Sequence, residues 1–157
     1  MKEFKALKWL CYLSFIGFLY CFVTDAGFCF AFFEASDDIN LVNESLRAII
    51  ENWTDKGFVY DEFMKNQLIK FYAIRIVFDI LALVGVILMF LKAKLGWTFY
   101  WIFQLAYVLS PFMLLDFEFT SSWPYFTGFA LLVTPIFNAI IHLVYVLLFF
   151  SQKKNLT

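Results

Sequence analysis

Long apolar stretches constrain this chain more than any other feature of its sequence. There are four of them, each with at least 21 residues: 9–33, 71–91, 95–115 and 125–150. A helix rises about 1.5 Å per residue, so about 20 apolar residues cross a hydrocarbon core about 30 Å thick. Because lipid offers a bare backbone no hydrogen-bond partner, each stretch is predicted to be a helix.

The composition agrees with this interpretation, since 63% of the residues are hydrophobic and only 16% are charged. Soluble domains carry about 25% charged residues. We therefore predict an all-α integral membrane protein with four transmembrane helices in an up-down bundle. No linker or repeat divides the chain, so residues 1–157 are predicted to form a single domain.

Charged residues outside the four spans predict their orientation. One face of the membrane would carry a single acid, Glu3, and seven lysines: Lys2, Lys5, Lys8, Lys92, Lys94, Lys153 and Lys154. The opposite face would carry the segment 34–70, with eight acids and four bases. Since cytoplasmic loops are rich in lysine and arginine, both termini are predicted to be cytoplasmic.

The outer segment 34–70 contains a short amphipathic helix of its own. Its apolar residues recur at helical spacing: Ile39, Val42, Leu46, Ile49, Ile50 and Trp53. The polar run 36–38 offers an N-cap, and Gly57 offers an end. We expect this helix to lie flat on the outer membrane surface or over the mouth of the bundle. Residues 60–70 lack Gly and Pro, so the second span is expected to extend outward through them.

Every span has one polar face. The residues on these faces are Ser14, Gly17, Cys21 and Asp25; Tyr72, Arg75 and Asp79; Tyr100, Gln104, Tyr107 and Pro111; and Thr134, Asn138, His142 and Tyr145. They follow one another three or four positions apart, which is the repeat of a helix face. The simplest packing turns all four polar faces inward and leaves the apolar faces to lipid.

Counting from the cytoplasmic lysines shows that these polar residues share depths in the membrane. Asp25 and Arg75 both come out about 25 Å from that face. Asp79, Tyr107 and Asn138 lie at about 20–22 Å, and Gln104 and His142 at about 15–16 Å. A lone charge at this depth costs about 2.5–3.5 kcal/mol, so we expect Arg75 to pair with Asp79 on its own helix or with Asp25 on the first.

The candidate site is this intramembrane polar cluster: Asp25, Arg75, Asp79, Gln104, Tyr107, Asn138 and His142. It could be a gated polar pathway or proton relay continued inward by Asn138 and His142. It could also be a buried ion pair that fixes how the helices are rotated against one another. We favour the second interpretation, because the inner half of the membrane holds no carboxylate that would complete a relay.

Several classes of protein are excluded. The cysteines Cys11, Cys21 and Cys29 form no C-x-x-C pair, and the single His142 has no second ligand at metal-binding spacing, so we expect neither a metal nor a cofactor. We read the cysteines as small packing residues. With a net charge of −1 the chain has no basic surplus for nucleic acid. No catalytic pair or phosphate loop occurs outside the spans, so an enzyme is not expected.

The stretch 83–100 contains a Gly, an apolar-Met pair, the turn Lys92-Ala93-Lys94, then Gly96-Trp97 and Tyr100, and it is followed by Gln104 and Pro111. This pattern resembles a family of small four-span inner-membrane proteins of flavobacteria and other Bacteroidota. The resemblance covers about residues 70–115. It implies a location in a bacterial inner membrane but no activity, because that family has no established activity.

Three functions are compatible with the sequence. The first is a non-catalytic accessory or structural subunit that packs in the bilayer against the subunits of a larger membrane complex. The second is a small transporter or an ion- or proton-conducting element that uses Asp25, Arg75, Asp79 and His142. The third is an immunity protein against a membrane-active toxin. The first is preferred because the chain has little mass outside the spans and a wide apolar surface.

Overall fold

The computed structural model describes residues 2–36, 38–55, 57, 59–115, 128–152 and 156, and it describes the backbone alone at residues 2–4, 112 and 128–139. Every regular element in this part of the chain is helical. The α-helices are α1 (Lys2–Glu34), α2 (Glu44–Thr54), α3 (Glu62–Phe90), α4 (Lys94–Leu114) and α6 (Gly128–Gln152), with the 3-10 helix η1 (Ile39–Leu41) before α2. The all-helical class is therefore confirmed for the described residues. Two of these helices, α1 and α3, are long and apolar enough to cross a membrane.

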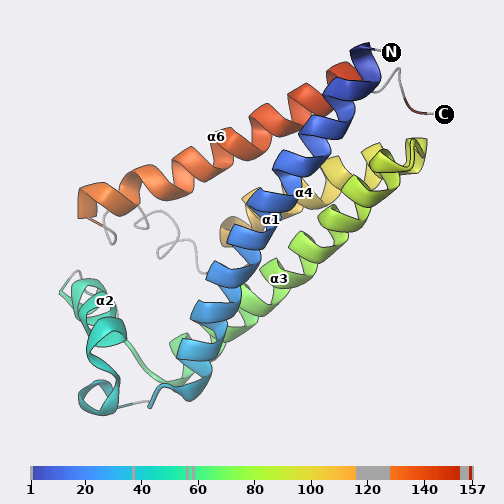
Figure 1. The fold of residues 1–157 in the computed structure, drawn as a ribbon. Coiled ribbons are helices and arrows are strands. Elements are labelled where there is room, and N and C mark those ends of the chain that lie inside the picture. Colours follow the sequence, from blue (N-terminus) through green and yellow to red (C-terminus); the bar gives the residue numbers. More distant parts are fainter. Residues whose placement is uncertain are drawn as a thin grey trace.

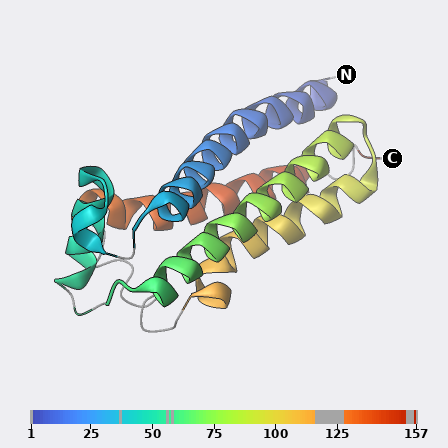
Figure 2. The ribbon, with the colours of Figure 1, turned by 90° about the horizontal axis from the view of Figure 1, so that it is seen from below.

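The long helices lie side by side. α1 packs along α3, and α3 packs along α4 (Figures 1 and 2). α6 contacts α1 and α4. Figure 1 shows that α6 lies near α1 at its C-terminal end and diverges from α1 toward its N-terminal end. The N-terminus, the C-terminus and the turn between α3 and α4 lie at one end of the molecule, and α2 lies at the other (Figure 1).

The helices agree with the predicted spans to different degrees, and α1 begins at Lys2, seven residues before the predicted start of the first span. α4 starts and ends within one residue of the predicted span 95–115. α3 begins well before residue 71, at an N-cap where the Asp61 side chain accepts a hydrogen bond from the backbone N–H of Met64 at 2.8 Å. The helix of the second span therefore continues through residues 62–70, which confirms the expected single long helix. The predicted start of the fourth span, residues 125–127, lies outside the described residues.

The prediction of one continuous helix over 39–53, capped within 36–38, is wrong at its start. Asp38 caps only η1, and α2 begins after a second cap, where Asn43 accepts a hydrogen bond from the N–H of Leu46 at 2.9 Å. An Asn side chain competes with the helix for the backbone donors next to it, so Asn43 favours a helix start over a helix interior. Arg47 then bridges the two elements by donating to the Val42 carbonyl at 3.0 Å.

α2 packs its apolar face at the end of the molecule away from the termini (Figure 1). Its buried residues Leu46, Ile50 and Trp53 belong to a core cluster with residues from the end of α1 and the start of α3. In this cluster Phe32 of α1 stacks on Trp53, with ring centroids 6.1 Å apart, and on Tyr72 at 6.0 Å. The apolar face of α2 therefore holds it against the end of α1 and the start of α3.

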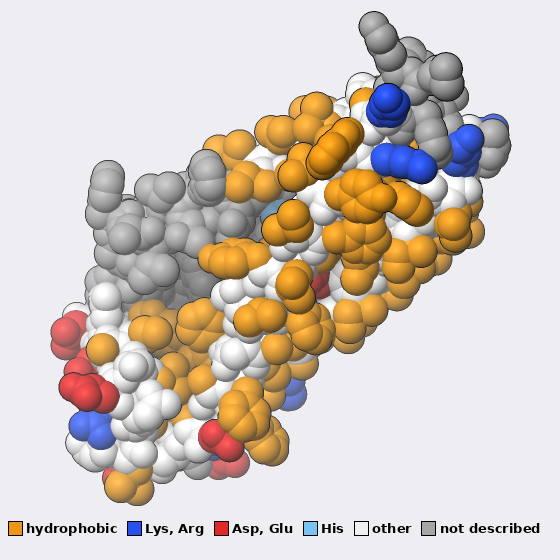
Figure 3. Space-filling view, viewed as in Figure 1, with side chains coloured by type: hydrophobic (Ala, Val, Ile, Leu, Met, Phe, Trp, Pro, Cys, Tyr) orange, Lys and Arg blue, Asp and Glu red, His pale blue; other side chains and the backbone are white. Residues whose placement is uncertain are grey.

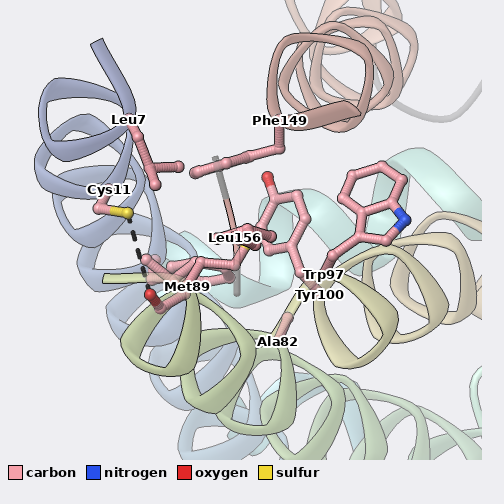
Figure 4. Close-up of a cluster of buried hydrophobic side chains, with 10 residues drawn as sticks. Leu7, Cys11, Ala82, Met89, Trp97, Tyr100, Phe149 and Leu156 are labelled. Atoms are coloured by element: carbon pink, nitrogen blue, oxygen red, sulfur yellow. Dashed lines mark hydrogen bonds between the residues drawn. The ribbon is translucent and has the colours of Figure 1, made fainter. Parts of the chain in front are cut away.

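A second core cluster joins α1, α3, α4 and α6 near the two termini (Figure 4). Leu7 of α1, Met89 of α3 and Phe149 of α6 are fully buried there, and Phe149 packs edge-on against Tyr100 of α4 at 4.7 Å. Cys11 is also buried, with its Sγ 3.9 Å from the Val86 carbonyl oxygen. The thiol fills a small space between α1 and α3, as expected of a packing cysteine.

The backbones of α3 and α4 approach each other closely at Gly85 and Gly96. A Cβ added at Gly85 would lie 2.5 Å from the backbone nitrogen of Tyr100. A Cβ added at Gly96 would lie 2.5 Å from the backbone nitrogen of Met89. Only glycine allows the two backbones to touch in this way, which is a common device between membrane helices.

The turn that joins α3 to α4 contains a backbone conformation that L-residues rarely adopt. Lys92 has a φ of 65°, and the N–H groups of Lys92 and Ala93 donate to the carbonyls of Met89 and Leu88 at 2.9 and 2.8 Å. This is a Schellman end, in which the position that Lys92 occupies is usually a glycine.

A Lys92→Gly variant is therefore expected to be more stable than wild type by about 1 kcal/mol, because glycine adopts positive φ without strain. The free energy of unfolding in mixed micelles measures the effect. Lys92→Ala is the control, since it removes the same side chain but keeps the strain. An equal gain in both variants would show that the lysine side chain, and not its backbone, is responsible.

Candidate functional site

Three helices meet at a buried ion pair. Asp25 of α1 is 2% exposed, and its Oδ2 accepts a hydrogen bond from Nε of Arg75 on α3 at 3.1 Å. The hydroxyl of Tyr107 on α4 donates to the same Oδ2 at 2.9 Å. Arg75 also donates through Nη2 to the Tyr107 oxygen, which closes the triangle. The three side chains therefore tie α1, α3 and α4 together. The depth shared by Asp25 and Arg75 agrees with their pairing, whereas Tyr107 was expected at a different depth.

Aromatic rings enclose the Arg75 guanidinium on two sides. Its Cζ lies 4.2 Å from the ring centroid of Tyr107 and 5.1 Å from that of Phe71. Ring faces attract a cation, and most strongly where water is excluded. Phe71 was not among the predicted site residues, although its position four residues before Arg75 on the same helix is a signal that could have found it.

The expected pairing of Arg75 with Asp79 is absent among the described residues, so that alternative is corrected in favour of Asp25. Long side chains on a helix lean toward its N-terminus, and Arg75 accordingly extends toward Phe71, away from Asp79. Asp79 is nevertheless 2% exposed, and its Oδ1 is buried with no hydrogen-bond partner.

Gln104 and His142 form a second polar contact, between α4 and α6. The Oε1 of Gln104, a residue that is also 2% exposed, lies at hydrogen-bond distance from the Nδ1 of His142. The His142 ring lies 5.0 Å from the ring of Tyr107, so this contact adjoins the first. Both residues also line a pocket of about 130 Å³ between α4 and α6, together with apolar side chains that include Trp101, Leu105 and Leu143.

Six of the seven predicted site residues are thus described, and five of them make side-chain contacts with one another. Asp79 lies among them without a hydrogen bond at Oδ1, and the side chain of Asn138 lies outside the described residues. The network can hold helices in a fixed rotation, and it can hold charge or a proton where the protein excludes water.

A Tyr107→Phe variant tests how much the shared hydroxyl contributes. We expect the free energy of unfolding to fall by about 1–3 kcal/mol, because Asp25 and Arg75 each lose one buried hydrogen bond while the ring over the guanidinium remains. Unfolding in mixed micelles measures the loss. Tyr12→Phe, at an exposed tyrosine on α1, is the control and should change little. Equal effects of the two variants would contradict the network.

Comparison of the chain with known protein families, with curated proteins and with solved structures finds no match.

Proposed function

We propose that the chain is a multi-pass protein of a bacterial inner membrane, with four spans and both termini in the cytoplasm. α4 and α6 have 21 and 25 residues, which at about 1.5 Å per residue is enough to cross a bilayer beside α1 and α3. Basic side chains support the orientation, because they gather at the end of the molecule where α1 begins and α3 turns into α4 (Figures 1 and 3). The inner-membrane location rests on the resemblance of residues 70–115 to the four-span family.

Within that membrane, we propose that the protein acts as a non-catalytic subunit that packs against a larger membrane complex. The observation that carries this proposal is the incomplete packing of α6. Between residues 140 and 150 its apolar side chains are largely exposed: Ile140, Ile141, Leu143, Val144, Leu147, Leu148 and Phe150. The pocket beside Gln104 opens along the same helix.

A partner helix would complete the packing that α6 lacks in the single chain. Membrane helices associate through close side-chain packing and through hydrogen bonds between helices. The α4–α6 pocket has a mostly apolar wall, and the partly exposed His142 adds a polar group to it. Lipid tails could fill the apolar wall, but they offer nothing to an imidazole, which is why a protein partner fits better.

Photo-crosslinking in native membranes tests the proposal. A photoreactive residue at Leu143 or Leu147 is expected to give one adduct with one membrane protein, at a fixed stoichiometry that persists after purification in mild detergent. The same residue at Phe149, which is fully buried, is the control and should give no adduct with another chain. A lone monodisperse monomer, with lipid adducts only, would overturn the proposal.

A second candidate function is an ion- or proton-conducting element, and the observation that favours it is the buried, unpartnered oxygen of Asp79. Flux across proteoliposomes tests it. Asp79→Asn and Arg75→Gln should each abolish a flux that the wild type shows. If the wild type passes no ion above the rate of empty liposomes, or if both variants keep its flux, this candidate is wrong.

A further inference from the structure

The charges in the middle of the bundle do not balance if every group is ionised. Asp25 and Asp79 are both buried carboxyls, and Arg75 is the permanent cation of the described cluster. Arg75 is already committed to Asp25, at 3.1 Å, and Tyr107 donates to the same carboxylate. An ionised Asp79 would therefore leave one negative charge without a counter-charge inside the protein.

Among the described side chains, none balances that charge. Its Oδ1 is buried and accepts no hydrogen bond, and no described cation lies within ion-pair distance of it. The titratable and charged groups nearest to it are Asp25 and Cys21 on α1 and Arg75 on its own helix. On α4, Tyr107 turns its hydroxyl to Asp25, and on α6, His142 is bound to Gln104.

A second carboxylate next to Asp25 would also be repelled by it, because like charges in a site shielded from water cannot both be ionised cheaply. Buried charges without partners are resolved in proteins by neutralisation. A protonated carboxyl is neutral, and its hydroxyl becomes a donor that needs only one acceptor. Protonation of Asp79 makes the whole cluster neutral, with Asp25 and Arg75 as its one ion pair.

We propose that Asp79 is a proton-binding site, and that its carboxyl carries a proton at neutral pH while Asp25 is ionised. The ligand is a proton taken from water, and the site lies on α3, buried near Asp25 and Cys21 of α1. This goes beyond the proposed role as a subunit, and it holds whether or not the protein conducts ions. A bundle that passes no current can still store a proton at Asp79.

Infrared difference spectroscopy of the protein in lipid bilayers at pH 7 tests the assignment. Subtracting Asp79→Asn from wild type should show the loss of one carbonyl-stretch band of a protonated carboxyl. The control is Asp61→Asn, the same substitution at the exposed N-cap of α3. Asparagine caps helices as well as aspartate does, so the helix should be kept. That variant should lose a carboxylate band instead.

Loss of a carboxylate band in Asp79→Asn would overturn the proposal, because the site would then hold an ionised group with a bound cation. If Asp79→Asn does not fold, NMR of the wild-type protein can report the protonation of Asp79 through its carboxyl carbon. With 13C-labelled aspartate in bilayers, its resonance should have the chemical shift of an acid at pH 7. The shift of a carboxylate would contradict protonation. This readout is independent of flux and of crosslinking, so it fails separately from either proposed function.

Discussion

An Arg75→Gln variant is expected to unfold with a free energy about 3–5 kcal/mol below that of wild type. The substitution leaves the Asp25 carboxylate buried with only the Tyr107 hydroxyl as a donor. Removing one partner of a buried ion pair is far more harmful than removing both, since the remaining charge has lost both water and counter-charge. Reversible unfolding in mixed micelles measures the difference.

The double variant Asp25→Asn with Arg75→Gln provides the matched comparison. It should recover most of the lost stability, because two neutral amides replace the pair and can hydrogen-bond to each other. Lys70→Gln removes a positive charge from an exposed position on the same helix and should have little effect. If the double variant is as unstable as the sum of the single variants, Arg75 and Asp25 are not coupled.

The second large effect is expected at the crossing of α3 and α4. In Gly85→Ala the new methyl group would lie 2.5 Å from a backbone nitrogen and 2.9 Å from two further backbone atoms, none of which can rotate away. The helices must separate, so we expect a loss of about 1–3 kcal/mol in the free energy of unfolding.

Gly17→Ala is the control for this prediction. Gly17 also lies within a long helix, but a Cβ there meets nothing within 4 Å. Alanine favours a helix over glycine by about 0.5–1 kcal/mol, so this variant should be slightly more stable than wild type. Unfolding measurements on both variants check the contrast. A gain in stability for Gly85→Ala would mean that the two backbones are not in contact.

Much of the candidate site could be predicted because helix geometry converts sequence spacing into depth. Asp25 lies as many residues from Lys8 as Arg75 lies from Lys92, and the structure joins the two side chains in an ion pair. The same counting paired Gln104 with His142. Periodicity along each helix gives its polar face, and the lysines give a common origin from which to measure height.

Periodicity gives neither the direction of a side chain nor its choice between partners. Two carboxyls were within reach of Arg75, and the choice of Asp25 depends on where the guanidinium points and on the rings of Phe71 and Tyr107. The proposed protonation of Asp79 depends on Arg75 being paired with Asp25, so the sequence alone could not predict it. The break before Asn43 was missed for a related reason, because the apolar repeat continues through η1 into α2 although the backbone does not.

The central claim is that polar side chains of the long helices face one another while the apolar faces meet lipid. Photolysis of an apolar carbene precursor dissolved in native membranes, followed by residue-level mass spectrometry, tests it most directly. We expect labelling at the exposed residues Leu19, Val23 and Val77 and none at Asp79 or Gln104. Labelling of Asp79 and Gln104, or protection of the three exposed residues, would contradict it.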